Sequence, residues 1–211
     1  MTLVRAIVAD DAAKASQLLA ASPVLAGIGA EKGATRQSAT DHYLVEIEHY
    51  LYAGDTALHV AGAAHRPEMV RLLVSMGADV DARNRRGATP LHYAADGSPG
   101  SPIWNPDAQA ETIDCLIQAG ADPNARDKSG VAPLHRAVRT RCAAAVTALL
   151  DGGADAGRTN KSGSTPLQLA TRATGRGGSG SPESKAQQAE IVDQLRRRGS
   201  ANWSGHVATS R

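Results

Sequence analysis

The 211-residue sequence contains no phenylalanine, and aromatic residues make up only 3% of it. Large rings therefore contribute little to the core, and alanine, leucine and valine must supply it, as thin stacked helices require. The sequence has only two cysteines, which follow no disulfide or metal-binding spacing. Unpatterned cysteines are typical of a reducing compartment, so we expect a cytoplasmic protein with reduced thiols.

Long apolar runs are also missing, which argues against a membrane-spanning segment. Asp10 and Asp11 interrupt the stretch in which a secretory signal needs apolar length, so no signal peptide is expected. The charge is nearly balanced, with 23 basic and 21 acidic residues and a net charge of +2. This modest charge disfavours nucleic acid as a partner.

A recurring motif dominates what the sequence does contain. The segment Gly87–Ala95 includes Thr-Pro-Leu-His, and related segments begin at three other glycines. These are Gly54, Gly130 and Gly163, and in chain order the four glycines lie 33, 43 and 33 residues apart. A second motif, Gly-Ala-Asp, recurs in phase at 77–79, 120–122 and 153–155. A period near 33 residues indicates stacked copies of one small unit.

The two motifs together resemble the ankyrin repeat. The resemblance implies an all-α solenoid of stacked helix-turn-helix units with β-turn fingers, so residues 1–200 are expected to form a single domain. The expected units are residues 1–27 (an N-terminal cap followed by an enlarged finger at 28–53), 54–86, 87–129, 130–162 and 163–200 (a C-terminal cap). Residues 201–211 have no apolar pattern and are expected to be a disordered tail.

Each unit carries local signals for two helices. Thr-Pro begins the first helix, because the threonine side chain caps free backbone N–H groups and proline has no backbone N–H that would need a partner. The second helix has apolar residues three apart, which share one face. These pairs are Val70 and Leu73, Ile113 and Leu116, Val146 and Leu149, and Val192 and Leu195. Glycines follow where a left-handed residue ends a helix, at Gly77, Gly120, Gly153 and Gly199.

Three insertions interrupt the period. The first finger, residues 28–53, contains Tyr43–Tyr52, whose composition predicts a short strand or hairpin rather than a helix. Residues 96–107 add a loop between the two helices of their unit. Residues 175–185 are rich in glycine and serine and predict a flexible segment in the last unit. We expect the last two insertions to emerge at the edge opposite the fingers.

His59, His92 and His135 invite a metal-binding or catalytic interpretation, but no Cys/His ligand spacing accompanies them. The resemblance implies instead that each imidazole ties its unit to the next through hydrogen bonds. Gln168 replaces the histidine in the last unit, where no further unit follows. We therefore expect no catalytic residue, no metal and no cofactor.

The unit at 130–162 departs most from the repeat pattern. Ala132 replaces the capping threonine, Arg136 occupies an apolar position, and Arg141 stands where a glycine usually links the two helices. Each change removes a feature that stabilises the unit. We expect this unit to be the least stable of the interior ones.

The expected partner-binding residues follow from the same resemblance, because ankyrin proteins usually bind partners with their finger tips and the exposed positions of their inner helices. They are Tyr50, Tyr52, Asp55, Arg85, Arg86, Lys128, Val131, Arg139, Lys161 and Arg172. The basic members form a stripe that fits an acidic partner protein, although an ordinary solvated face is also compatible with it. Tyr50 and Tyr52 either anchor a partner or pack against the next inner helix.

The expected function is a non-enzymatic, monomeric module for protein–protein interaction through the finger edge and the concave inner-helix face. One alternative is a regulatory or immunity-type inhibitor that blocks a partner enzyme with the long first finger or the loop around Trp104. Another is nucleic-acid binding through the basic finger edge, which a steep salt dependence would reveal. A third is an enzyme with its chemistry in the first finger, which offers only ordinary residues: Asp41, His42, Glu46, Glu48 and His49.

Overall fold

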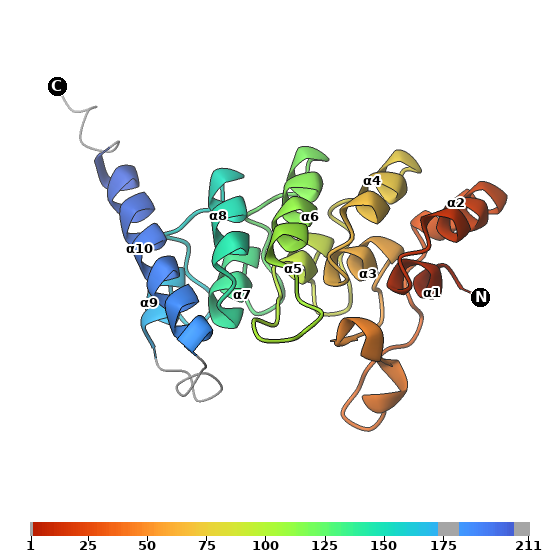
Figure 1. Cartoon of the computed structure of the whole chain (residues 1–211), viewed down its shortest axis with the longest axis horizontal. Coiled ribbons are helices and arrows are strands. Elements are labelled where there is room, and N and C mark those ends of the chain that lie inside the picture. Colours follow the sequence, from red (N-terminus) through yellow and green to blue (C-terminus); the bar gives the residue numbers. More distant parts are fainter. Residues whose placement is uncertain (1, 173–181, 205–211) are drawn as a thin grey trace.

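The computed structural model describes residues 2–172 and 182–204, and within them five pairs of helices stack side by side (Figure 1). Each pair contributes one helix to an inner layer and one to an outer layer. The pairs are α1 (Leu3–Val8) with α2 (Ala12–Ala21), α3 (Ala57–Ala63) with α4 (Pro67–Ser75), α5 (Pro90–Ala94) with α6 (Pro106–Gln118), α7 (Pro133–Thr140) with α8 (Ala143–Asp151), and α9 (Pro166–Thr171) with α10 (Pro182–Ser204). The predicted all-α repeat solenoid is confirmed.

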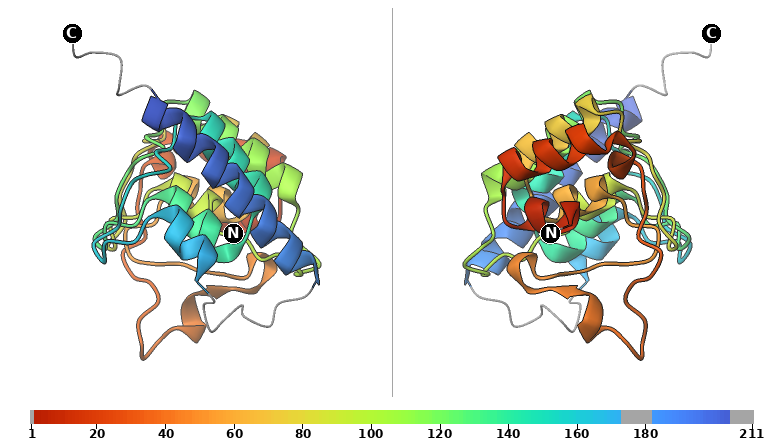
Figure 2. Two further views of the ribbon diagram at one scale, coloured as in Figure 1. Left: turned by 90° about the vertical axis from the view of Figure 1, so that its left-hand side faces the viewer. Right: turned by 90° about the vertical axis from the view of Figure 1, so that its right-hand side faces the viewer.

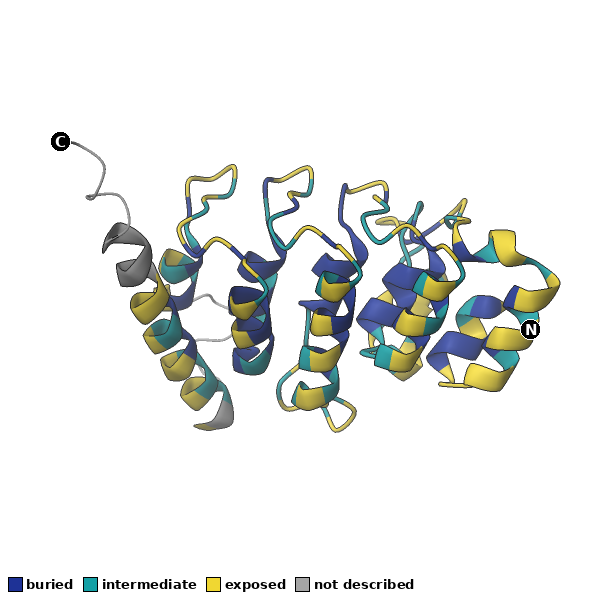
Figure 3. Cartoon of the chain, turned by 90° about the horizontal axis from the view of Figure 1, so that it is seen from above, coloured by how far each residue is buried: buried dark blue, intermediate teal, exposed yellow. Residues whose placement is uncertain are grey.

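The core is a thin layer of small and branched aliphatic side chains between the inner and outer helices. Inner helices pack on inner helices and outer on outer, so each pair buries its apolar residues against its neighbours. Seen from above, the outer helices present exposed residues while buried residues lie between neighbouring pairs (Figure 3). Leucines at equivalent positions are fully or almost fully buried: Leu58, Leu91 and Leu134 on inner helices, and Leu73, Leu116, Leu149 and Leu195 on outer helices.

Most of the predicted helix ends are confirmed. Gly77, Gly120 and Gly153 have φ values of +84°, +100° and +91°, the left-handed backbone that ends a helix. The prediction for Gly199 is wrong, because α10 continues through it to Ser204. The sequence pairs Val192 with Leu195, but Val192 is only half-buried. The buried residue on the same face as Leu195 is Ile191, which lies about one helical turn before it.

The turn between the inner and outer helix of a pair needs a left-handed residue in three units. Asp10, His65 and Arg141 hold this position with φ values of +56°, +50° and +61°. Residues with a Cβ rarely adopt this backbone, so the packing of each helix pair must hold it in place. Arg141 thus departs from glycine in sequence without changing the course of the chain.

The first finger folds back on itself and passes beneath the inner helices (Figure 2). Strands β1 (Tyr43–Leu44) and β2 (His49–Tyr50) pair in antiparallel fashion, which confirms the predicted hairpin. Short 3₁₀ helices flank and link the strands, at Thr40–His42 and Val45–Ile47, and another, Pro23–Ala26, follows α2. Glu48 closes the hairpin turn with a left-handed φ of +50°.

The other insertions lie where the sequence places them, as far as they are described. Residues 96–105, here called the Trp104 loop, connect α5 to α6. The buried Gln109 holds this loop: its side-chain oxygen accepts a 2.8 Å hydrogen bond from the Trp104 indole, and its amide donates to the Ala94 and Asp96 carbonyls.

Much of the predicted glycine- and serine-rich segment lies outside the described residues, and α10 begins at Pro182. The tail was expected to be disordered from residue 201, but α10 extends to Ser204, and residues 205–211 are not described. Across the described part of the chain, no helix is both long and apolar enough to span a bilayer.

Candidate interaction surface

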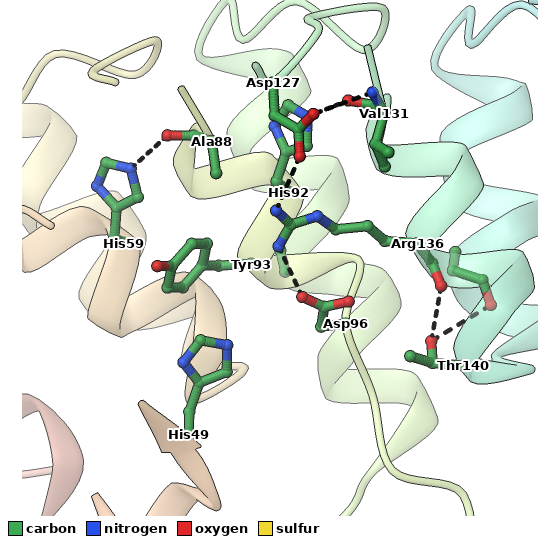
Figure 4. Close-up of polar contacts among 12 residues, drawn as sticks. His49, His59, Ala88, His92, Tyr93, Asp96, Asp127, Val131, Arg136 and Thr140 are labelled. Atoms are coloured by element: carbon green, nitrogen blue, oxygen red, sulfur yellow. Dashed lines mark hydrogen bonds and ion pairs between the residues drawn. The ribbon is translucent and has the colours of Figure 1, made fainter. Parts of the chain in front are cut away.

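The three repeat histidines, His59, His92 and His135, link neighbouring units, and each has the same tautomer. The backbone N–H of Thr89 donates to Nδ1 of His92, so Nδ1 carries no proton, and Nε2 donates to the Val131 carbonyl at 2.9 Å (Figure 4). His59 bonds the Ala88 carbonyl at 3.0 Å and His135 the Ser164 carbonyl at 3.2 Å in the same way. Both ring nitrogens are therefore used in the neutral form.

Burial lowers the pKa of these three imidazoles, and that of His92 falls to about 4. The structural role that the resemblance implied is thus visible in the hydrogen bonds. In the last unit, the side-chain oxygen of Gln168 accepts the equivalent bond from the Thr165 N–H. Within the described residues, no group of three or more His, Cys, Asp or Glu side chains is arranged to hold a metal ion.

The finger edge is tied together by backbone hydrogen bonds between successive units. The N–H of Arg85 donates to the Ala53 carbonyl at 2.8 Å, and that of Lys128 donates to the Arg86 carbonyl at 2.9 Å. The N–H of Lys161 donates to Ser129 in the same register at 3.2 Å. The basic tips therefore form a rigid row, one per unit, rather than independent flexible turns.

All six predicted arginines and lysines are exposed, but they are not equally free. The Arg85 guanidinium donates to the Ala34 carbonyl of the first finger at 3.1 Å, and Lys161 Nζ donates to the Lys128 carbonyl at 2.6 Å. Arg172 donates to the Ser164 hydroxyl at 3.2 Å. These contacts orient the side chains along the edge and leave their charge facing solvent.

Asp55 is the one predicted contact residue that the structure removes from the surface. Its side chain is only 3% exposed, and its carboxylate accepts hydrogen bonds from the Asn84 amide, the Tyr93 hydroxyl and the Tyr52 N–H. Burial and the Asp55 carboxylate raise the pKa of Tyr93, so its hydroxyl stays a donor. Because it is buried, Asp55 is not available to a partner, and its hydrogen bonds join the first finger to the repeats.

The first finger and the inner helices α5 and α7 enclose a cavity of about 290 Å³, here called the concave cavity. Five predicted contact residues meet in its lining: Tyr50, Tyr52, Arg86, Val131 and Arg139. Arg85, Lys128, Lys161 and Arg172 lie outside this lining. Nine further residues line it: Glu48, His49, Asn84, Ala88, Tyr93, Asp96, Asp127, Ser129 and Arg136.

A buried ion cluster lies within this lining. The Arg136 guanidinium contacts the Asp96 carboxylate at 2.8 Å and the Asp127 carboxylate at 3.5 Å, and lies 5.8 Å from the centre of the Tyr93 ring (Figure 4). Burial disfavours the charged guanidinium, but Asp96, Asp127 and Tyr93 together outweigh this effect and raise the pKa of Arg136. The arginine at an apolar position is therefore matched by two carboxylates, one on the Trp104 loop and one on a finger.

The two finger tyrosines have different environments. Tyr52 packs beside the buried Tyr93, Ala63 and Ala88, and Arg86 lies over its ring at 4.9 Å. Tyr50 is 40% exposed and stacks on its cross-strand partner Tyr43 with 4.8 Å between ring centres. Packing therefore describes Tyr52, whereas Tyr50 retains an open ring surface.

His49 lies between the concave cavity and a second one. Its ring stacks on Tyr93 at 4.6 Å, and burial lowers its pKa. On its other side, a cavity of about 200 Å³ lies between the hairpin tip, the end of α3 and the Trp104 loop. The half-buried Ile47 and Trp104 and the exposed Ile103 contribute apolar surface to it. The two largest insertions that the structure describes thus face each other across this cavity.

Comparison with known protein families identifies the repeats directly. Models described as ankyrin repeats match residues 25–101 (three copies), 86–128 (a single repeat) and 116–170 (many copies). Together these matches run without a gap from residue 25 to residue 170.

Curated relatives match over shorter stretches. The NF-kappa-B inhibitor cactus of Drosophila melanogaster is 42% identical over 53 residues, which is 25% of this chain and 11% of cactus. The protein phosphatase 1 regulatory subunit 12A of Mus musculus is 40% identical over 60 residues, 28% of this chain and 6% of that protein. The matches therefore span only a small part of these relatives.

Proposed function

The chain belongs to the ankyrin-repeat family, and on this basis we propose that it is a non-catalytic module that binds another protein through its finger edge and concave face. Ankyrin repeats mediate protein–protein interaction, and stacked units present an extended surface suited to that role. The observation that carries the proposal is the rigid row of exposed basic tips beside the concave cavity.

The row of basic tips favours a partner with an acidic surface. Arg86, Lys128 and Lys161 project from successive fingers whose backbones are hydrogen-bonded to one another, so their charges keep a fixed spacing. Charges at the rim of an interface chiefly raise the association rate and fix orientation. Their effect is screened by salt, since the Debye length is about 8 Å at physiological ionic strength.

A kinetic experiment tests this surface. The partner is recovered by affinity capture and its binding to the Arg86→Glu/Lys128→Glu variant is measured at several salt concentrations. We expect slower association and a weaker salt dependence than for the parent protein. Arg196→Glu is the matched control, because Arg196 is an exposed arginine on the outer helix α10. Equal association rates for the parent and the double variant at low salt would contradict the proposal.

The same measurements address nucleic acid as the partner. The nucleic-acid alternative would be favoured if the protein bound a generic DNA duplex with an affinity that falls steeply between 50 and 200 mM salt, while its affinity for the captured protein did not change with salt. The concave cavity argues for a protein, because its lining combines tyrosines, ion pairs and a half-buried valine rather than a row of basic residues with stacking platforms.

A second candidate function is regulation of a partner enzyme by steric blocking. Two of the relatives are an inhibitor and a regulatory subunit, and in this chain the first finger and the Trp104 loop line one cavity beside the repeats. If the protein acts in this way, shortening the Trp104 loop by residues 99–102, which keeps Asp96 and Trp104, would leave partner binding intact and abolish the inhibition of the captured enzyme.

We also propose that the protein acts as a monomer in the cytoplasm. Cys115 and Cys142 are free and buried, and burial raises the pKa of Cys142 to about 11. Such thiols are poor nucleophiles, which supports a packing role in a reducing compartment. Size-exclusion chromatography with light scattering and fractionation of cells test the two statements.

A further inference from the structure

We propose that the cavity of about 200 Å³ between the hairpin tip and the Trp104 loop, here called the hairpin–loop cavity, binds one lysine side chain of the partner protein. The carbon stem of the lysine packs on apolar side chains of the lining, and its ammonium group faces the acidic ones. This inference rests on the proposed function, because it assigns one contact with the partner. It uses none of the basic residues of the finger edge.

Three separate segments enclose the hairpin–loop cavity. They are the hairpin tip, the turn from α3 to α4, and the Trp104 loop with the start of α6. Their lining residues are 46–49, 63–66, and 96–98 with 103–105 and 108. The hairpin and the Trp104 loop are insertions into the repeat period, so this cavity distinguishes the chain from a regular array of repeats.

Apolar side chains in this lining remain open to solvent. Ile103 is 55% exposed although it is a large aliphatic residue, and the half-buried Ile47 and Trp104 line the same cavity. The Trp104 ring is held in place, because its indole N–H donates to Gln109 at 2.8 Å. A four-carbon stem placed here would remove apolar surface from water on both partners. An indole ring also attracts a cation.

The lining carries a net negative charge. Its acids are Glu46, Glu48 and Asp96, against one arginine, Arg66. Burial lowers the pKa of the two histidines in the lining, so both are neutral at neutral pH. Three negative charges against one positive charge leave an excess of two negative charges.

Ion pairs with residues outside the lining do not remove this excess. Asp96 pairs with Arg136, which is shared with Asp127, and Arg66 pairs with Asp10 at 3.5 Å. These outside partners add one positive charge and two negative charges. The surroundings of the cavity are therefore at least as negative as its lining, which favours a cationic ligand.

Glu46 and Glu48 hold the unpaired charge. Within the described residues, neither side chain makes an ion pair or a hydrogen bond, and both residues are exposed. They directly precede and follow Ile47, so both carboxylates belong to residues that adjoin the apolar surface. Lysine fits this combination, because its stem can lie along apolar surface while its charged end stays in water near the acids.

An anion is disfavoured at the same place. The N-terminus of α6 lies at the cavity, and the N-terminus of a helix attracts anions. The Asn105 side chain already accepts hydrogen bonds from the Asp107 and Ala108 N–H groups, at 3.0 and 3.1 Å. A carboxylate or phosphate would therefore meet two free glutamates and an arginine that is already paired.

A titration with a single side chain tests the cavity without the partner. ¹⁵N-labelled protein is titrated at low, constant ionic strength with N-acetyl-lysine N-methylamide. The norleucine analogue is the control ligand, because its side chain has the same four carbons without the ammonium group. We expect saturable shifts of the Ile47 and Ile103 amides and the Trp104 indole with both compounds. The lysine compound should bind about threefold more tightly, as one exposed ion pair implies.

Two variants separate the charge from the apolar contact. Glu46→Gln/Glu48→Gln should bind the lysine compound no more tightly than the norleucine compound. Ile103→Ser should bind both about fourfold more weakly, as loss of one buried methylene implies. The three side chains are exposed, so both variants should remain folded, as circular dichroism will show. Glu31→Gln is the matched control, because Glu31 is an exposed acid of the same finger outside the lining, and it should leave both titrations unchanged.

Several results would overturn the lysine assignment. Without saturable shifts at the cavity, the site does not bind a side chain. Equal affinities of the parent protein for the lysine and norleucine compounds would show that the charge plays no part. Equal weakening in the Glu31→Gln variant would show that only the overall charge of the finger matters. Tighter binding of N-acetyl-glutamate N-methylamide would assign the cavity to an anion instead.

The captured partner then distinguishes failure of this inference from failure of the proposed function. If Ile103→Ser and Glu46→Gln/Glu48→Gln weaken partner binding while Glu31→Gln does not, the inference is supported. If only the Arg86→Glu/Lys128→Glu variant weakens it, the finger edge binds the partner and the lysine contact is refuted. If none of these variants changes partner binding, the proposed function fails as well.

Discussion

Replacing Arg136 with methionine should destabilise the protein, because it leaves a carboxylate without its partner inside the fold. The side chains of Arg136, Asp96 and Asp127 are only 12%, 23% and 11% exposed. Removing one member of a buried ion pair costs about 3–5 kcal/mol. Asp127 keeps its bonds to backbone N–H groups and Asp96 keeps some access to water, so we expect about 3 kcal/mol, at the lower end of that range.

For a protein of this size, such a loss corresponds to a fall in Tm of about 6–12 °C. Thermal and urea unfolding followed by circular dichroism measure it. Arg139→Met, on the same helix but exposed, is the control and should change stability by less than about 0.5 kcal/mol.

The double variant Arg136→Met/Asp96→Asn provides the decisive comparison. Removing the charge of Asp96 takes away the penalty that the single variant creates, so the double variant should recover at least about 1 kcal/mol. Additive losses in this cycle, or an Arg136→Met protein as stable as the parent, would refute the assignment of Arg136 as the shared partner of two acids.

Hydrogen exchange on the parent protein also tests whether the unit at 130–162 opens before its neighbours.

Three further outcomes are expected. Leu116→Ala empties a fully buried site between neighbouring units and should lower the free energy of unfolding, measured in urea, by about 2–5 kcal/mol. Gln118→Ala, at an exposed position of the same helix, should lower it little. Equal effects of the two substitutions would contradict the repeat register. Burial lowers the pKa of His65 and that of His92 to about 4 in the folded protein, against 6.5 in the unfolded chain. The unfolded chain therefore binds more protons between these values, and stability should fall as pH drops from about 6.5 towards 4, by up to about 3 kcal/mol for each histidine. A urea midpoint that is unchanged between pH 7 and pH 4.5 would disprove this prediction. Gly33→Ala would place a Cβ 2.3 Å from the backbone of the returning arm of the first finger, so that finger should open and be cleaved faster in limited proteolysis than in the parent, with the helices left intact.

The repeat architecture was predictable because its signals are local and periodic. A Thr-Pro helix start, apolar residues three apart and a glycine after the helix act over a few residues, and their recurrence near 33 residues reveals the stacking. The roles of His59 and His92 followed from the family resemblance, and their bonds to the next unit match it. The exposure of Arg86 and Lys128 followed from their place in the turn.

The prediction was weakest where the period breaks. Tyr43–Tyr52 carried enough strand-forming residues to predict a hairpin, but its composition did not determine which side of the solenoid the hairpin would cover. Near the C-terminus, the expected stop at Gly199 failed because a glycine only permits a helix to end there, and α10 continues to Ser204.

Only the tertiary structure determined the concave cavity and the fate of Asp55. Asp55 resembles an exposed turn residue in sequence, yet Asn84 and Tyr93, 29 and 38 residues away, converge on its carboxylate and bury it. Arg136 occupies a position that is usually apolar in the repeat, and the sequence does not reveal that Asp96 and Asp127 pair with it. Local patterns specify helices because backbone hydrogen bonds close within four residues, whereas a pocket depends on the packing of side chains from distant segments, for which this sequence has no repeating signal.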